Sequence, residues 1–187
     1  MATSAAFKVH IRPARAQDDA ALIPLLAAFR AELDALVGAV HPPRLEAARA
    51  TLADHRRRGD PIFVAEHSGR LVGFLVCRVD DGVVWAEALY VAPAYRRRGV
   101  ASRLYDQAEA LAQQYGEPTV YNWVHPNNPA ILAFLARRGY RVLNLIEIRR
   151  PLPGETLAGQ VTIGAHTLAY PVPLPANADA SATQRAA

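Results

Sequence analysis

Three consecutive arginines and a glycine, residues 96–99, are the segment of this chain whose composition most clearly suggests chemistry. An apolar run from Val83 to Val91 precedes the segment, and apolar residues recur at helical spacing from Ala101 onward. A helix N-terminus carries unpaired N–H groups and a partial positive charge, so it can bind a phosphate where it follows a strand. Gly99 has no Cβ, which would let a ligand approach the backbone closely. The segment is interpreted either as a diphosphate-binding turn or as a solvated basic turn that opens an ordinary helix.

The strands and helices that would position this turn alternate along the chain in small groups. The sequence contains no internal repeat. Tight turns at residues 67–70 and 80–82 would join the three middle strands into an antiparallel meander. Leucines and a phenylalanine between Leu22 and Leu36 form a helical stripe, which Gly38 closes. The pattern predicts strands at 7–12, 62–66, 71–79, 83–91, 119–124 and 140–149, and helices at 18–37, 43–58, 100–115 and 128–138.

Several of these segments resemble the GNAT superfamily of acyl-CoA-dependent N-acetyltransferases. The sequence Tyr-Arg-Arg-Arg-Gly-Val-Ala at 95–101 is similar to the family's Arg/Gln-x-x-Gly-x-Gly/Ala motif, and 89–93 resembles the strand that precedes it. Residues 128–140 resemble the second signature, a helix that ends in Gly-Phe or Gly-Tyr, and 11–14 followed by Asp18 resembles the usual opening. The resemblance extends over residues 8–150 and keeps the family's order.

The resemblance implies an α/β fold, with a mixed, mostly antiparallel sheet flanked by helices on both faces. Residues 1–150 would form the acetyltransferase domain, and 151–187 would form a C-terminal extension. Within that extension the apolar pairs around Gly164 predict a small hairpin. Pro171, Pro173 and Pro175 indicate an extended edge, and 177–187 has the composition of a flexible tail. The extension could cover a pocket, form a dimer contact or pack on the sheet, so monomer and homodimer both stay open.

Acetyl-CoA would be the co-substrate. In the family the pantetheine arm enters between two splayed strands, which here would be 83–91 and 119–124, and the diphosphate binds the following turn. A backbone N–H of the first strand can polarise the thioester carbonyl and stabilise the oxyanion. The resemblance thus implies a cofactor-binding set of Leu89, Tyr90, Val91, Arg96, Arg97, Arg98, Gly99, Val100, Ala101, Ser102 and Asn128.

The implied reaction is direct attack on the thioester by a primary amine of a small molecule or a protein. Deprotonating a lysine-like amine at pH 7 costs about 4–5 kcal/mol, so a general base would help. No metal is needed, and the histidines show no metal-ligand spacing. Three polar residues near the first helix, Glu32, Asp34 and His41, could reach an acceptor pocket, although solvent exposure is the simpler interpretation of each.

Glu87 is the first candidate for the base, because it precedes the segment 89–91 on the strand that faces the active site in the family. Strand alternation would place Glu87, Leu89 and Val91 on one side. The alternative is a cross-strand surface carboxylate. His125 is the second candidate, since it follows the other splayed strand and histidine titrates in a suitable range. Its alternative is a loop histidine before a proline.

One departure from the family pattern concerns the proton that the leaving thiolate needs. Leu135 lies where many members carry a tyrosine that is taken to supply it, and leucine cannot donate a proton. Tyr90, Tyr105, Tyr121 or water could substitute. The departure favours a second hypothesis, in which the chain is a non-catalytic acyl-CoA-binding module.

Bulk composition excludes several other classes. The chain has 187 residues and a net charge of +4, with arginine clusters at 56–58, 96–98, 137–138 and 149–150. A nucleic-acid-binding domain could look like this and stays a third hypothesis, but the clusters are short and scattered, so solvated faces are the preferred interpretation of all except the central one at 96–98. No apolar run approaches the ~18 residues of a membrane span, and residues 1–10 lack a signal-peptide core. Cys77 is the only cysteine, so it fits a cytoplasmic protein and a buried hydrophobe rather than a nucleophile.

Overall fold

The computed structural model describes residues 7–173, and these divide into two compact units. The first unit comprises residues 7–31 and 42–123, and the second comprises 32–41 and 124–173. The elements in chain order are β1 (His10–Pro13), a 3₁₀ turn (Ala16–Asp18), α1 (Asp19–Ala35), α2 (Leu45–Arg58), β2 (Ile62–His67), β3 (Arg70–Asp80), β4 (Val83–Val91), a second 3₁₀ turn (Pro93–Tyr95), α3 (Val100–Gln114), β5 (Tyr121–Asn122), α4 (Pro129–Arg137), β6 (Gly159–Ile163) and β7 (His166–Tyr170).

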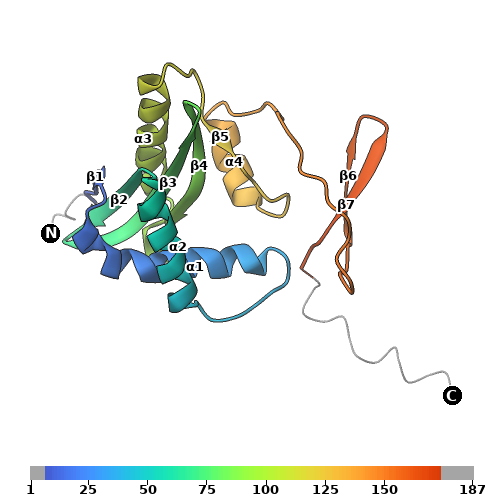
Figure 1. Ribbon diagram of the computed structural model, residues 1–187, viewed down its shortest axis with the longest axis horizontal. Coiled ribbons are helices and arrows are strands. Elements are labelled where there is room, and N and C mark those ends of the chain that lie inside the picture. The colour runs from blue at the N-terminus through green and yellow to red at the C-terminus, as the bar shows by residue number, and fades with distance from the viewer. Residues whose placement is uncertain (1–6, 174–187) are drawn as a thin grey trace, which may run out of the picture. The chain divides into compact units, whose positions relative to one another are not determined.

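The first unit is built on a five-stranded sheet in the order β1-β2-β3-β4-β5 (Figure 1). The first four strands pair antiparallel, and β5 joins β4 in parallel. Ser68-Gly69 and Asp81-Gly82 connect the middle strands with positive φ at both central residues. Two-residue hairpin turns require this conformation, which glycine adopts without strain. The predicted mixed, mostly antiparallel sheet is thus confirmed.

Helices cover the sheet of the first unit on both faces (Figure 1). The amphipathic helix α3 buries Val100, Leu104, Tyr105 and Ala108 against one face. Helices α1 and α2 bury their apolar stripes against the other face, where the removal of apolar surface from water stabilises the packing. The core on that side consists of Leu22, Ile23, Leu26, Ala27, Ala48, Leu52, Ile62, Val64, Phe74, Val76, Ala88 and Tyr90.

A β-bulge in β4 changes the direction of one side chain. Val76 pairs with Ala88 and Cys77 pairs with Ala86, so Glu87 has no partner residue in β3. The predicted unbroken alternation of this strand is therefore wrong at Glu87. A bulge inserts one residue into the ladder and re-aims the side chain there, which is a common device beside functional sites.

Strands β4 and β5 separate soon after they meet. They pair only through Trp85 with Tyr121 and through Ala86 with Asn122, so β5 is shorter than the predicted 119–124. Stacking of Trp123 on Trp85, with ring centroids 4.7 Å apart, continues the contact beyond the last backbone pair. Beyond Ala86, no described strand pairs with this edge of β4. Backbone pairing between the two strands thus ends at Ala86 and Asn122.

The second unit contains α4 and the predicted hairpin of β6 and β7, whose turn is at Gly164-Ala165 and is one residue shorter than the predicted 164–166, because His166 pairs with Ile163. The predicted strand at 140–149 is wrong: these residues form no strand, and Val142 and Leu145 are 90% and 74% exposed. Strand propensity describes how a residue fits a paired, half-buried surface, and no described strand pairs with this segment. The predicted flexible tail at 177–187 lies outside the described residues.

Among residues 7–173, no helix has the length and apolar character needed to cross a bilayer.

An ion-pair network ties β1 to the start of α1 and should make the first unit sensitive to acid. Arg12 donates to both carboxylate oxygens of Asp18 at 2.7 and 2.9 Å and also binds Glu66. The hydrogen bonds from Arg12 lower the pKa of the buried Asp18 to about 2.

We expect this network to stabilise the fold fully above about pH 4 and to lose its contribution as pH falls toward 2, because the folded pKa lies below the unfolded one. The shift corresponds to about 2 kcal/mol. Urea unfolding of wild type and Asp18→Asn as a function of pH would check this. The variant should lose most of that free energy of unfolding at neutral pH and show a flatter acid limb, and equal acid limbs would contradict the assignment.

Candidate functional site

The turn between β4 and α3 presents backbone donors to solvent. Arg97 and Gly99 have positive φ angles of 62° and 77°, and residues 96–99 are all exposed. Arg103 N–H donates to the Gly99 carbonyl at 3.1 Å, and this bond begins the helical ladder of α3. The N–H groups of Val100 and Ala101 come before it in the first turn, where N–H groups have no acceptor within the helix. Turns of this kind direct successive N–H groups toward an anion, and the helix dipole adds to the attraction. An arrangement of this kind is suited to binding an anion such as a phosphate.

Gly99 has open space where a side chain would begin. A Cβ built on Gly99 meets no atom within 4 Å, and the φ angle of +77° is one that other residues adopt only with strain. Glycine therefore both permits the turn and leaves the space in front of its backbone clear for a ligand.

The arginines of the turn make different contacts. Arg96 Nε donates to the Val91 carbonyl at 2.7 Å, and its guanidinium lies 5.4 Å from the centroid of the Tyr90 ring. Arg98 lies over the ring of Phe7 at 5.1 Å. Two of the arginines thus fasten the turn to β4 and to the N-terminal segment while keeping positive charge beside it.

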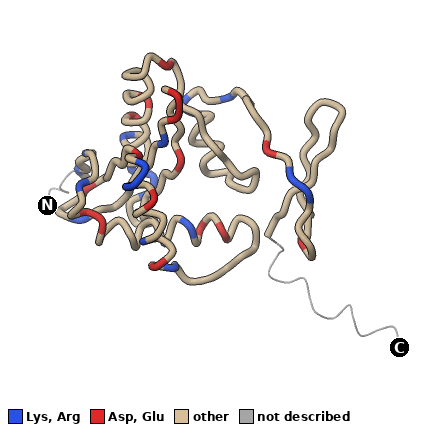
Figure 2. The backbone as a smooth tube through the Cα atoms, in the orientation of Figure 1, with Lys and Arg blue, Asp and Glu red and all other residues tan. Residues whose placement is uncertain are grey.

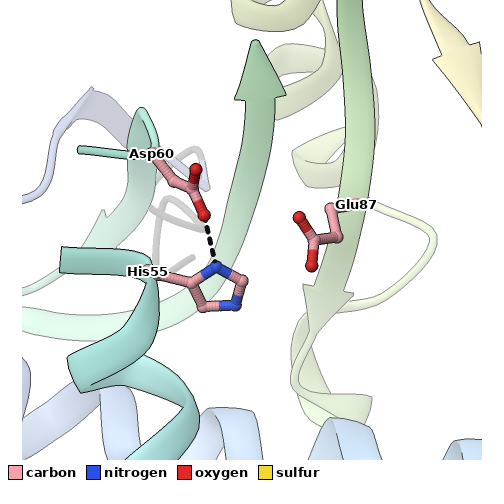
Figure 3. A group of neighbouring side chains, drawn as sticks. All are labelled: His55, Asp60 and Glu87. Atoms are coloured by element: carbon pink, nitrogen blue, oxygen red, sulfur yellow. Dashed lines mark hydrogen bonds and ion pairs between the residues drawn. The ribbon is translucent and has the colours of Figure 1, made fainter. Parts of the chain in front are cut away.

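Glu87 faces a cluster at the C-terminal end of α2 (Figure 3). His55 Nδ1 lies 2.7 Å from Asp60 Oδ2, and these two side chains are 4% and 5% exposed. Arg58 binds the same Asp60 oxygen through two nitrogens at 2.5 and 3.0 Å, and its guanidinium lies 3.7 Å from Glu87 Oε1. Glu87 Oε2 is buried and has no hydrogen-bond partner in the described structure. The bulge thus aims a carboxylate at a buried histidine.

His55, Asp60 and Glu87 offer atom types that bind metals, within 4.8 Å of one another. The guanidinium of Arg58, however, lies against Asp60 Oδ2 and 2.8 Å from His55 Nδ1. Arg58 already provides the cation of this cluster, so we do not assign these residues as metal ligands.

His125 and Asn128 lie in the second unit. His125 Nδ1 accepts a hydrogen bond from the Asn127 N–H at 3.1 Å, and burial lowers the pKa of the ring. This bond places the proton of the neutral ring on Nε2, so the free lone pair that a base needs is already engaged. Asn128 caps α4 by accepting from the Ile131 N–H at 3.2 Å, which accounts for an asparagine at this position.

Leu135 is 6% exposed and supports the packing of α4, as its apolar side chain predicts. Of the tyrosines that could replace the missing acid, Tyr105 is fully buried and donates to Asn122 Oδ1 at 3.0 Å. Tyr121 packs its ring on Trp85 at 5.1 Å. Cys77 is buried, and burial raises the pKa of its thiol to about 12, in agreement with a hydrophobic role.

The arginine cluster at 56–58 is paired with acids. Arg56 binds Asp19, Arg57 binds Asp54 and Arg58 binds Asp60. Figure 2 shows basic and acidic residues interspersed over the first unit rather than gathered in one block. This cluster is therefore a salt-bridged end of α2, and of the three arginines only Arg58 reaches the Glu87 cluster.

Sequence comparison places these features in a known family. The sequence profile described as the acetyltransferase (GNAT) family matches residues 26–140. Mycothiol acetyltransferase of Geodermatophilus obscurus is 35% identical over 98 residues, which are 51% of this chain and 31% of that protein. An uncharacterized N-acetyltransferase of Methanocaldococcus jannaschii is 27% identical over 99 residues, 49% of this chain and 44% of that protein. The chain thus spans less than half the length of these curated relatives.

Solved structures show the same fold. The aminoglycoside N-acetyltransferase AAC(6')-Iy in complex with CoA matches with a TM-score of 0.62 and 18% identity, over 80% of this chain and 99% of that one. The PaiA N-acetyltransferase of Thermoplasma acidophilum in complex with coenzyme A matches with a TM-score of 0.60 and 18% identity, over 70% and 88%.

Proposed function

The chain belongs to the acetyltransferase (GNAT) family, and from this premise we propose that it transfers an acetyl group from acetyl-CoA to a primary amine. The single observation that carries the proposal is the exposed turn of residues 96–99, with Gly99 open to a ligand at the N-terminus of α3. This turn follows directly on β4, whose edge beyond Ala86 has no described strand partner. A diphosphate and an extended pantetheine arm need these two features side by side.

The backbone of the turn would hold the diphosphate, through the N–H groups from Val100 to Ser102 and the charge of the arginines. The edge of β4 at residues 89–91, with which no described strand pairs beyond Ala86, would pair with the pantetheine arm as an added strand. An N–H of that edge, aimed at the thioester oxygen, would stabilise the negative charge that develops there. Asn128 of the second unit, at the start of α4, is also proposed as a cofactor-binding residue, on the resemblance to the family's second signature alone.

Glu87 is the proposed general base. The amine loses a proton to the Glu87 carboxylate and its nitrogen attacks the thioester carbon, so a C–N bond forms. Collapse of the tetrahedral intermediate breaks the C–S bond, and the thiolate of CoA leaves with the electron pair. The nitrogen loses its second proton, which reaches the thiolate through water. His125 stays the second candidate, but its engaged Nδ1 makes Glu87 the better one.

Ligand-induced stabilisation is the direct test of the cofactor site. Acetyl-CoA at ~100 times its dissociation constant should add about 2.7 kcal/mol to the free energy of unfolding. Thermal unfolding with acetyl-CoA, CoA and ATP would measure this, and we expect stabilisation by the first two only. Equal stabilisation by ATP would indicate a general phosphate site, and no stabilisation by any ligand would contradict the proposal.

The acceptor amine can be identified by testing candidate amines for their ability to release CoA from acetyl-CoA. The names of the relatives favour a small molecule, because mycothiol acetyltransferase and an aminoglycoside N-acetyltransferase are among the similar proteins. We therefore propose aminoglycosides as the first amines, with a lysine-containing peptide as the protein-like probe.

The second candidate function is a non-catalytic acyl-CoA-binding module, and the buried Leu135 in place of an acid favours it. This alternative predicts stabilisation by acetyl-CoA without amine-dependent release of CoA. The two assays together thus separate the two functions.

A further inference from the structure

The cluster of His55, Arg58, Asp60 and Glu87 lacks charge balance when the imidazole is neutral. Two carboxylates then face one guanidinium, at a place where the side chains of His55 and Asp60 are almost fully buried. Uncompensated charge is costly at such burial. One additional proton, on the imidazole or on Glu87, would balance the cluster beside Glu87 Oε2, which is buried and has no hydrogen-bond partner in the described structure.

The neighbouring ionisable groups do not supply this charge. Asp54 and Arg57, on the same helix, pair with each other at 2.7 Å. Cys77, on β3, keeps a neutral thiol because burial raises its pKa to about 12. The balancing proton therefore belongs to His55 and Glu87.

Asp60 selects the nitrogen of His55 that exchanges this proton. Nδ1 lies 2.7 Å from Asp60 Oδ2 and 2.8 Å from Arg58 Nη2. We place its hydrogen toward Asp60, because a bare Nδ1 would set two lone pairs against each other there and the N–H groups of Arg58 are also directed to this carboxylate. Nε2 then has the free lone pair of the neutral ring, and Figure 3 shows the ring edge that carries it on the side of Glu87.

We propose that Asp60 and His55 are positioning residues for Glu87, and that His55 Nε2 shares the proton that Glu87 accepts. This inference rests on the proposed function, in which Glu87 is the base. One proton moves in the step, from the ammonium nitrogen to the carboxylate and then to Nε2, while the Nδ1–H bond to Asp60 persists. Atoms of Glu87 and His55 lie within 4.8 Å, a separation that one water can bridge. The proton returns to solvent through Glu87, whose side chain is 27% exposed.

The test follows the ring of His55 directly by long-range ¹H–¹⁵N NMR between about pH 5 and 8. The chain has six histidines, so the signals of His55 are assigned by their loss in His55→Gln. We expect Nδ1 to carry the proton in the neutral ring of the wild type. In Glu87→Gln, the pH at which the ring changes protonation should fall by about one unit or more, because a carboxylate that favours the charged ring is gone.

Glu46→Gln is the matched control, since it removes a carboxylate from an exposed position of the same helix. It should leave the pH dependence of His55 unchanged. Thermal unfolding of each variant would confirm that it is folded, and Glu87 is the safer site to change because its side chain is only partly buried.

A kinetic arm uses the best amine of the CoA-release screen. His55→Gln should lower kcat about tenfold and change the shape of the pH–rate profile, with KM for acetyl-CoA unchanged. Asp60→Asn, which still accepts the Nδ1–H bond, should have a smaller effect.

Three results would overturn the inference: an Nε2–H tautomer in the wild type, the same pH dependence of His55 in Glu87→Gln as in the wild type, or stoichiometric binding of Zn²⁺ to the ring. Absence of CoA release by the wild type would instead remove the proposed function. The NMR arm does not depend on activity, so the two failures are distinguishable.

Discussion

Gly99→Glu is expected to abolish binding of acetyl-CoA, with a loss of affinity of about 100-fold or more. The space in front of Gly99 is empty of protein atoms, and a glutamate side chain would enter it. The carboxylate would then lie where the diphosphate is proposed to bind, and two like charges in contact cost several kcal/mol. Isothermal titration with CoA would measure the change.

The φ angle of Gly99 means that any side chain there also strains the turn, so strain must be separated from charge. Gly69 offers a matched control, because its φ of +73° is close to the +77° of Gly99 and its Cβ would also meet nothing within 4 Å. Gly69→Glu adds the same side chain and charge to the turn between β2 and β3. We expect it to lower the stability by about 1 kcal/mol and to leave CoA binding intact. Equal affinity of Gly99→Glu and wild type for CoA would refute the assignment of the turn.

The sheet and the conformation of the turn at 96–99 could be predicted because short-range sequence encodes both. Ser68-Gly69 and Asp81-Gly82 force tight turns with positive φ, and these turns set which strands pair. Gly59 ends α2 in a left-handed conformation for the same local reason. The turn at 96–99 needs only its own residues and the start of a helix. These features do not depend on the packing of distant segments.

The direction of Glu87 could not be predicted, because no glycine or proline marks the bulge. Its position depends on how β3 and β4 register against the helices on either face, which is a property of the packed core. The partners of Glu87 were missed for a related reason. His55 and Asp60 flank the end of α2, and only the tertiary fold brings them to Glu87, which lies 32 and 27 residues further along the chain.

At residues 140–149 the strand prediction failed for the opposite reason: the local sequence clearly favours a strand, and the structure has none. Its valine, leucines and isoleucines favour a strand, yet they are exposed and pair with no described strand. Strand propensity takes effect only beside an available edge, and sequence alone does not say whether such an edge exists.

Glu87→Gln is expected to lower kcat for the best amine by about 10²–10³-fold at pH 7 while leaving the affinity for CoA nearly unchanged. The substitution keeps the size of the side chain, so the bulge and the packing of β4 should persist. The amide cannot accept the proton of the attacking ammonium, and the reaction then depends on the small fraction of amine that is already neutral. That fraction rises with pH, so the loss of activity should be greatest at low pH.

The measurement is the pH–rate profile of amine-dependent CoA release for wild type, Glu87→Gln and Glu87→Asp. Aspartate keeps the carboxylate but withdraws it by one methylene, so it should recover part of the rate and the acid limb of the wild-type profile. If Glu87 is the general base, Glu87→Asp must recover part of the rate that Glu87→Gln loses. If Glu87 only supports the fold, through its 3.7 Å contact with Arg58, kcat of each variant should fall in proportion to its loss of stability instead. A profile of Glu87→Gln with the shape and height of the wild type would remove Glu87 as the base.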